Sequence, residues 1–303
     1  MIRQLLLHTL LLAATVAAAG GADLVRVATL HPLLSDLARQ VGGDRVEVIS
    51  VLPTSADVHA FNPAPEDLKK LDKAQLVLAM GKGLESYLPK LKENLRKEQT
   101  LLEVGRTIPS LTIDTDNALF ACCPDHSHGA LDPHWWHSVP AMKRATRTLA
   151  KTLSSLDPDH KSTYMQRAST YGKELDELDT WVSRTLAPIP RSHRKLATAH
   201  LAYSYFCRDH RFQAIPVQGL NKEQNPSPAY LKQVVRTLTT NKVPAIFPEH
   251  DANPKLIATI AKDTGVRIGP ALLADNLSEE ISTYPRFIRH NVQAIAKTLT
   301  STD

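Results

Sequence analysis

The sequence predicts an α/β protein of two lobes, each with a mainly parallel sheet flanked by helices, joined by one long helix. Apolar runs rich in Val, Ile and Leu alternate with stretches of helical periodicity, which is the pattern of βαβ units. This alternation occurs before residue 140 and again after residue 190, whereas the region between them is helical and has no strand-like run. A length of 303 residues with 43% hydrophobic residues is enough for two domains with sizeable cores.

The first lobe is predicted to begin with a βαβ unit. Residues 24–30 form an expected strand, residues 31–41 a helix and residues 46–51 the next strand, and a further strand is expected at residues 75–80. Strands that read as near-continuous apolar runs are typical of a parallel sheet covered by helices on both faces. We therefore expect these strands to lie parallel in one buried sheet.

The second lobe repeats the alternation. Its expected strands lie at residues 195–198, 212–217, 243–247 and 266–268. Its clearest helical stretches are residues 227–239 and 254–264. Helices between successive strands again predict parallel pairing, because a parallel crossover needs a connection of this length.

The region between the lobes, residues 140–186, has helical composition with one interruption at Asp157-Pro158. Proline is favoured in the first turn of a helix, so we expect Asp157 to cap a second helix that begins at Pro158. Extending to about residue 186, this helix would contain roughly 29 residues and be about 40 Å long, which suits a rigid connection between two lobes. The expected division of the chain is a signal peptide at residues 1–22, a first lobe at 23–155, the connecting helix at 156–187 and a second lobe at 188–303.

The N-terminus has the features of a secretory signal peptide. Arg3 gives a positive start, residues 5–19 are apolar apart from His8 and two threonines, and small residues at 17–20 predict cleavage near residues 19–22. The apolar run is shorter than the roughly 20 residues of a spanning helix, and no cysteine follows it to carry a lipid. We expect an exported, periplasmic protein.

Charge and cysteine content exclude several classes of protein. The 36 Lys and Arg residues exceed the 31 Asp and Glu residues by only five, and they are scattered along the chain, so nucleic acid is not an expected partner. Three cysteines are too few for a disulfide scaffold. The informative excess is 13 histidines.

Four residues are candidates for a metal site: His59, His134, His200 and Asp275. Each lies in a short polar segment just after, or close to, a strand-like run. Because ligands bind at the carboxyl ends of strands in parallel α/β sheets, these distant residues can converge between the lobes. Three imidazoles and a carboxylate would form the closed four-ligand shell of a zinc site that holds the ion, although their wide spacings match no local zinc motif.

Residues 24–298 resemble the metal-specific solute-binding proteins of ABC transporters, the ZnuA/TroA-like cluster A-I family. The stretches that carry the resemblance are, in chain order, VEVISVLPTSADVHAFNPAPEDLKKL, DPHWW, LATAHLAYSYF, NPSP, FPEHDANPKLIATIAKDTGV and ALLADNL. The resemblance implies two α/β lobes on one long helix, a metal ion in the cleft between them, no enzymatic activity, and delivery of the ion to a membrane permease. It places the metal ligands at His59, His134, His200 and Asp275. We expect a monomer, with a periplasmic zinc chaperone as an optional second partner.

The expected ligand is Zn²⁺, because three imidazoles favour zinc over manganese, which prefers oxygen ligands. A manganese or iron carrier of the same family is one alternative. A zinc hydrolase is another, in which water occupies the fourth position and Glu249 is the base. The HExxH motif of many zinc hydrolases is absent. Glu249 can equally accept a hydrogen bond from a ligand imidazole or serve as an ordinary capping residue.

The segment at residues 119–132 contains Cys122, Cys123, His126 and His128. These side chains either capture zinc weakly and pass it inward or form a solvated loop, and the sequence leaves both interpretations open. It also leaves open the disulfide state of the two cysteines and of Cys207, which we expect to pack as a small buried apolar residue.

Several residues near the candidate ligands are expected to have other roles. His31 follows the first strand and faces the predicted cleft, and His137 lies three residues beyond His134. Neither is an expected ligand; for His137, the reason is that the DPHxW pattern of the family selects His134. Trp135 and Trp136 are expected to contribute packing rather than recognition.

Overall fold

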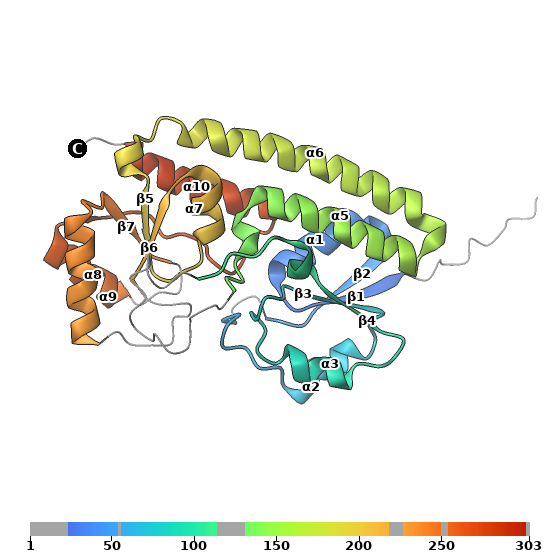
Figure 1. The fold of residues 1–303 in the computed structure, drawn as a ribbon. Helices are drawn as coiled ribbons and strands as arrows, with labels where there is room; N and C mark the ends of the chain where they lie inside the picture. The colour runs from blue at the N-terminus through green and yellow to red at the C-terminus, as the bar shows by residue number, and fades with distance from the viewer. Residues whose placement is uncertain (1–23, 54–55, 114–130, 218–226, 250–253, 301–303) are drawn as a thin grey trace, which may run out of the picture.

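The computed structural model describes residues 24–53, 56–113, 131–217, 227–249 and 254–300. Within these residues the predicted fold class is confirmed: two four-stranded parallel sheets are each flanked by helices, and a long helix runs along both (Figure 1). The expected signal peptide at residues 1–22 lies outside the described residues. No helix of the described part of the chain has the length and apolar character needed to cross a membrane.

The first sheet has the strand order β2-β1-β3-β4, with every neighbouring pair parallel. Its strands are β1 (Val25–Thr29), β2 (Val46–Ser50), β3 (Leu76–Ala79) and β4 (Thr100–Glu103). Helix α1 (Pro32–Gly42) covers one face, and α2 (Pro65–Leu71) and α3 (Leu88–Asn94) cover the other (Figure 1). Three of these strands were predicted and β4 was missed, because it is an edge strand whose residues are all only partly buried.

The second sheet has the order β6-β5-β7-β8, again entirely parallel. Its strands are β5 (Lys195–Thr198), β6 (Gln213–Pro216), β7 (Ala245–Phe247) and β8 (Arg267–Ile268). Helices α8 (Pro228–Thr240) and α9 (Pro254–Thr264) pack on one face, and α7 (Ser204–His210) and α10 (Tyr284–Thr300) lie on the other. The four predicted strands are therefore present, within one or two residues at each end.

Two consecutive helices connect the sheets. Helix α5 (Val139–Leu156) belongs to the first lobe, and α6 (Lys161–Leu186) has 26 residues, which corresponds to about 39 Å. Figure 1 shows α6 extending over both lobes; it packs against α5 and α1 and, towards its other end, against α10. The predicted connecting helix is thus present.

The start of this helix differs in detail from the prediction. Pro158 begins the 3-10 turn η4 (Pro158–His160), so the α-helix starts three residues later than expected. The Asp157 side chain does not cap a backbone N–H. It accepts hydrogen bonds from the His160 ring at 2.9 Å and from the Tyr164 hydroxyl at 2.7 Å, and these side-chain donors take its two oxygens.

One apolar core runs through both lobes. It contains buried side chains from β1, α5, α6, α7 and α10, among them Val27, Leu149, Leu175, Phe206 and Phe287. A shared core of this kind holds two lobes together far more firmly than a flexible linker would, because separating them would expose apolar surface to water. The two lobes are therefore held in a fixed arrangement.

Candidate metal centre

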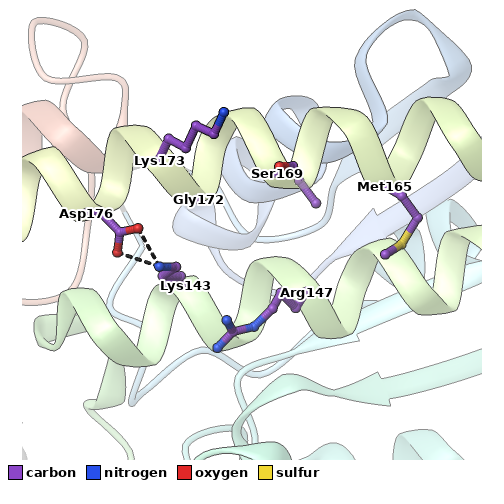
Figure 2. A pocket seen from close by; sticks show the side chains of 8 residues that line it. Lys143, Arg147, Met165, Ser169, Gly172, Lys173 and Asp176 are labelled. Atoms are coloured by element: carbon purple, nitrogen blue, oxygen red, sulfur yellow. Dashed lines mark hydrogen bonds and ion pairs between the residues drawn. The ribbon is translucent and has the colours of Figure 1, made fainter.

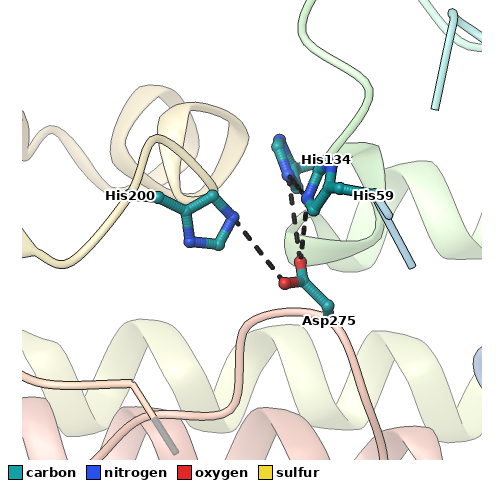
Figure 3. Close-up of side chains that lie close together, drawn as sticks. All are labelled: His59, His134, His200 and Asp275. Atoms are coloured by element: carbon teal, nitrogen blue, oxygen red, sulfur yellow. Dashed lines mark hydrogen bonds and ion pairs between the residues drawn. The ribbon is translucent and has the colours of Figure 1, made fainter. Parts of the chain in front are cut away.

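The side chains of His59, His134, His200 and Asp275 lie close together, although they come from distant segments of both lobes (Figure 3). His59 lies in the loop after β2, and His200 lies two residues after the end of β5. His134 directly precedes the 3-10 turn η3 (Trp135–His137), and Asp275 lies in the segment between β8 and α10. The structure thus brings together the four residues singled out in the sequence, which we call the His₃Asp cluster.

The spacing within the His₃Asp cluster suits a small ion. One ligand atom from each residue lies within 4.8 Å of all the others. The His59 and His134 Nε2 atoms are 3.3 Å apart, and each is 3.8 Å from Asp275 Oδ1. His200 Nε2 is 3.7 Å from Asp275 Oδ2. Tetrahedral bonds of about 2.0–2.2 Å place ligand atoms about 3.3–3.6 Å apart, so only small shifts separate this arrangement from a coordination shell.

Two buried carboxylates orient two of the imidazoles. His134 Nδ1 lies 2.9 Å from Asp132 Oδ1, and His200 Nδ1 lies 2.5 Å from Glu249 Oε2. A carboxylate only accepts hydrogen bonds, so each ring carries its proton on Nδ1 and turns the lone pair of Nε2 towards the cluster. Backbone N–H groups of the same two histidines donate to the same two carboxylates, at 2.8 and 2.9 Å, which fixes the carboxylates as well.

This arrangement decides between the two interpretations of Glu249. Its carboxylate is 2% exposed and bonds His200 through both oxygens, as expected of an acceptor that orients a ligand imidazole. Asp132 has the equivalent position behind His134 and was not singled out in the sequence. The signal was its place two residues before His134 in DPHWW, where an Asp readily accepts the N–H of the second following residue.

Burial sets the protonation of His134. It lowers the pKa of His134, against the opposing effect of Asp132, so the imidazole is neutral near pH 7. Burial also opposes ionisation of Asp132, but hydrogen bonds from the ring and backbone of His134 and from Ser204 lower the pKa of that carboxyl. A neutral imidazole held by an ionised carboxylate is ready to bind a cation without first losing a proton.

The profile of the family described as "Zinc-uptake complex component A periplasmic" (ZnuA) matches residues 27–298. The chain belongs to this family. The resemblance stated from sequence motifs is therefore confirmed.

Relatives within the ZnuA family differ in the metal that their names specify. The chain is 28% identical to the iron-binding protein YfeA of Yersinia pestis over 275 residues, covering 90% of this chain and 85% of the relative. It is 30% identical to the manganese-binding lipoprotein MntA of Bacillus subtilis over 274 residues, covering 88% and 87%. The solved structure of the periplasmic zinc-binding protein TroA from Treponema pallidum superimposes with a TM-score of 0.82 at 24% identity, covering 91% of this chain and 99% of TroA.

Membership of the ZnuA family establishes the general function. The protein is a metal-binding substrate-binding protein of an ABC transporter, and such proteins work with the permease and ATPase components of the transporter. These family members are not enzymes, so the hydrolase interpretation is wrong. Glu249 agrees with this, because both of its oxygens are engaged with His200.

Two ring side chains beside the cluster, those of Trp136 and His137, hold two of the ligand-bearing segments together by hydrogen bonds. Trp136 Nε1 and His137 Nε2 both donate to the carbonyl oxygen of Ala274, at 2.8 Å each. Trp135 and Trp136 are fully buried, so the packing role predicted for them is confirmed. As Ala274 directly precedes Asp275, these two bonds join the segment of His134 to the segment of Asp275.

Cys207, the cysteine within the described part of the chain, does not belong to this centre. Cys207 is a buried free thiol in the main core, as predicted, and burial raises its pKa. The predictions for Cys122, Cys123, His126 and His128 lie outside the described residues.

A hollow lies between α5 and α6, away from the His₃Asp cluster (Figure 2). It has a volume of about 320 Å³, and its lining includes Lys143, Arg147, Lys173 and Asp176. Lys143 forms an ion pair with both carboxylate oxygens of Asp176 at 2.5 Å. The hollow shares no residue with the cluster. Part of the charge along it is neutralised by the Lys143–Asp176 ion pair, and we interpret it as an ordinary groove between two packed helices.

Proposed function

We propose that this protein captures Zn²⁺ outside the cytoplasmic membrane and delivers it to an ABC transporter permease for import. The observation that supports zinc most directly is the composition of the cluster: three imidazole nitrogens and one carboxylate, whose ligand atoms all lie within 4.8 Å of one another. Zinc takes four nitrogen and oxygen ligands in a tetrahedron, and a shell of four protein ligands holds the ion without leaving a position for reactive water.

The proposal assigns a role to each residue of the site. His59, His134, His200 and Asp275 bind the ion. Asp132 and Glu249 hold the imidazoles of His134 and His200 in the orientation that binding needs. His59 is the most accessible of the four, with a side chain 11% exposed, so the ion enters and leaves past His59.

A manganese or iron carrier is the second candidate, favoured by the names of two relatives. YfeA is iron-binding and MntA is manganese-binding, and this chain is about as similar to each as it is to the other. Manganese prefers six ligands with many oxygens, whereas the cluster supplies three nitrogens and one carboxylate, so its chemistry favours zinc.

Metal analysis tests the proposal directly. The mature protein, purified without added metal, is analysed for bound metal and then titrated with Zn²⁺, Mn²⁺ and Fe²⁺ against a competing chelator. We expect one zinc per chain with a sub-micromolar Kd, more favourable than about −8 kcal/mol. His59→Ala, His134→Ala and His200→Ala should each weaken binding strongly. His193→Ala, at a half-buried histidine bonded to the Leu299 carbonyl, is the matched control and should bind as the unaltered protein does. Preferential binding of manganese or iron would overturn the zinc assignment.

A further inference from the structure

His31 is a buried imidazole at the carboxyl end of β1, the strand between β2 and β3 in the first sheet. It is the N-cap of α1, and its Nδ1 accepts the backbone N–H of Leu33 at 3.2 Å. An atom that accepts an N–H carries a lone pair, so the proton of the neutral ring must be on Nε2. His31 therefore presents a hydrogen-bond donor at Nε2 and cannot bind a metal through that atom in this tautomer.

This donor is not used within the described part of the chain. His31 is 0% exposed, and its Nε2 has no hydrogen-bond partner among the described residues. Leaving a buried donor unpaired is costly, and native proteins rarely do so without a reason. The ring is also firmly held, because the Leu33 N–H fixes one edge and Trp136 packs against it at a centroid distance of 5.0 Å.

The surroundings of His31 place it beside the His₃Asp cluster. Trp136, which packs on His31, also packs on His134 at a centroid distance of 5.1 Å. Burial lowers the pKa of His31 to about 3, and the charges that act on it are those of Asp275, His59 and His134. Of these three residues, Asp275 is the one whose side chain is a carboxylate, which accepts hydrogen bonds at both oxygens.

We propose that His31 is a selectivity residue: when an ion draws the Asp275 carboxylate into its coordination shell, the Nε2–H of His31 donates to the carboxylate oxygen that does not bind the ion. This inference rests on the proposed function, since it requires Asp275 to be a ligand. A hydrogen bond to one carboxylate oxygen leaves the other as the single ligand atom of Asp275. The coordination shell is then limited to four protein atoms.

Limiting Asp275 to one bond favours zinc over manganese. A carboxylate that binds through both oxygens would raise the number of donors from four to five and add an oxygen, which suits an ion with higher coordination. Four donors of which three are nitrogens suit tetrahedral zinc. His31 thus strengthens the preference for zinc over manganese beyond what the four ligand residues supply by themselves.

Two substitutions separate this role from the helix cap. Asn places its side-chain oxygen where Nδ1 of histidine lies, and Asn is a preferred N-cap, so His31→Asn keeps the cap of α1 and removes the Nε2 donor. Gln places its amide nitrogen near the position of Nε2, so His31→Gln keeps a donor and loses the cap. Each variant removes one of the two functions of His31.

The experiment measures the Kd of Zn²⁺ and of Mn²⁺ for the unaltered protein and both variants, with Co²⁺ as a spectroscopic probe of coordination number. We expect His31→Asn to lower the ratio of zinc to manganese affinity about tenfold or more, because the lost hydrogen bond involves a charged group. Its Co²⁺ visible bands should weaken, as they do when coordination rises above four. His31→Gln should keep the ratio and the Co²⁺ spectrum but unfold at a lower temperature.

Three results are decisive. An unchanged ratio and Co²⁺ spectrum in His31→Asn would overturn the inference, and so would an equal loss of affinity for both metals, which indicates a merely structural role. A protein that prefers manganese before any substitution would refute the proposed zinc function instead. In that case a further fall in the ratio in His31→Asn would still support the role of His31.

Discussion

Asn276 donates its side-chain amide to the backbone carbonyl oxygen of Ala56 at 2.9 Å, although the two residues are 220 positions apart. Asn276 directly follows Asp275, and Ala56 lies three residues before His59. The bond therefore ties the loop of His59 to the segment of Asp275, across the two lobes. Since His59 is the most exposed member of the His₃Asp cluster, this bond restrains the side chain past which an ion would move.

Removing this bond should speed the release of zinc. Asn276→Ala deletes one hydrogen bond, worth about 1 kcal/mol, so we expect the rate of zinc dissociation to rise about fivefold. Stopped-flow mixing of the zinc-loaded protein with an excess of chelator measures this rate. Asn94→Ala is the control, because Asn94 also donates its amide to a backbone carbonyl, that of Lys90, but at an exposed position at the end of α3. Equal rates for the two variants would show that the Ala56 bond does not restrain the loop.

The carboxylates behind the imidazoles should contribute to affinity without binding the ion. Glu249→Gln keeps the shape of the side chain but removes the charge that favours the Nδ1–H tautomer of His200, and we expect zinc affinity to fall about 10–100-fold. Asp132→Asn should have a similar effect through His134. Competition titration with a chelator measures both, and Glu93→Gln on the exposed face of α3 is the neutral comparison. Full affinity in both buried variants would remove these carboxylates from the site.

The buried strands could be predicted from the sequence because a strand that is buried on both faces consists of a continuous run of apolar residues. Leu76 and Val77 are both fully buried, so β3 reads as a continuous apolar run. Edge strand β4 has no such run, since Thr100 and Glu103 are half-buried and the strand has only two apolar residues. The start of α6 was misplaced for a related reason: Asp157 meets His160 and Tyr164 only in the folded chain.

The candidate site was predictable as a set of residues but not as a geometry. His59, His134, His200 and Asp275 stand out through their polar segments and the family motifs. Their separations depend on how two sheets are held on one helix, which no local pattern encodes. Asp132 and the donor of His31 are tertiary features of the same kind, since each acquires its role from a neighbour that only the fold supplies.

Zinc affinity should fall steeply in acid. Three imidazoles must be neutral to bind, and free imidazole has a pKa of about 6.5, so protons compete with zinc at up to three positions. Because burial lowers the pKa of His134, its proton competes only at lower pH than that of a free imidazole. We expect the slope of log K against pH to steepen below about 6.5 and to approach about three. A flat profile between pH 7 and 5 would contradict a three-histidine site.

The stability of the metal-free protein should also depend on pH, through histidines that are not ligands. Burial lowers the pKa of His137 to about 3, whereas the unfolded chain keeps a value of about 6.5. Between these values the unfolded state binds a proton that the folded state does not, so stability is full above about pH 6.5 and is lost as pH falls towards 3. Urea unfolding from pH 7 to 4.5 measures this loss. His137→Gln keeps a donor for the Ala274 carbonyl but does not titrate, so its stability should vary less with pH. An equally steep variation in this variant would contradict the assignment.

Metal binding should change the shape of the protein only slightly. The lobes share one apolar core, and α6 lies along both. Tyr205 adds a polar link: its hydroxyl donates to the carbonyl oxygen of Pro109 at 3.2 Å and accepts the N–H of Leu111 at 3.1 Å, across the lobes. A straight helix of 26 residues resists bending, so we expect a tilt of a few degrees and local ordering of the ligand segments.

Scattering and hydrogen exchange test this expectation together. The radius of gyration of the metal-free and zinc-loaded protein should differ by no more than about 1 Å, whereas backbone amides near His200 and Asp275 should exchange more slowly with zinc bound. A change of several ångström would show that α6 behaves as a hinge. Identical exchange in both states would show that the ligand segments are already ordered. Because His200 and Asp275 lie in segments bonded to the first lobe through Tyr205 and Ala274, we expect zinc to leave slowly unless the permease separates these segments.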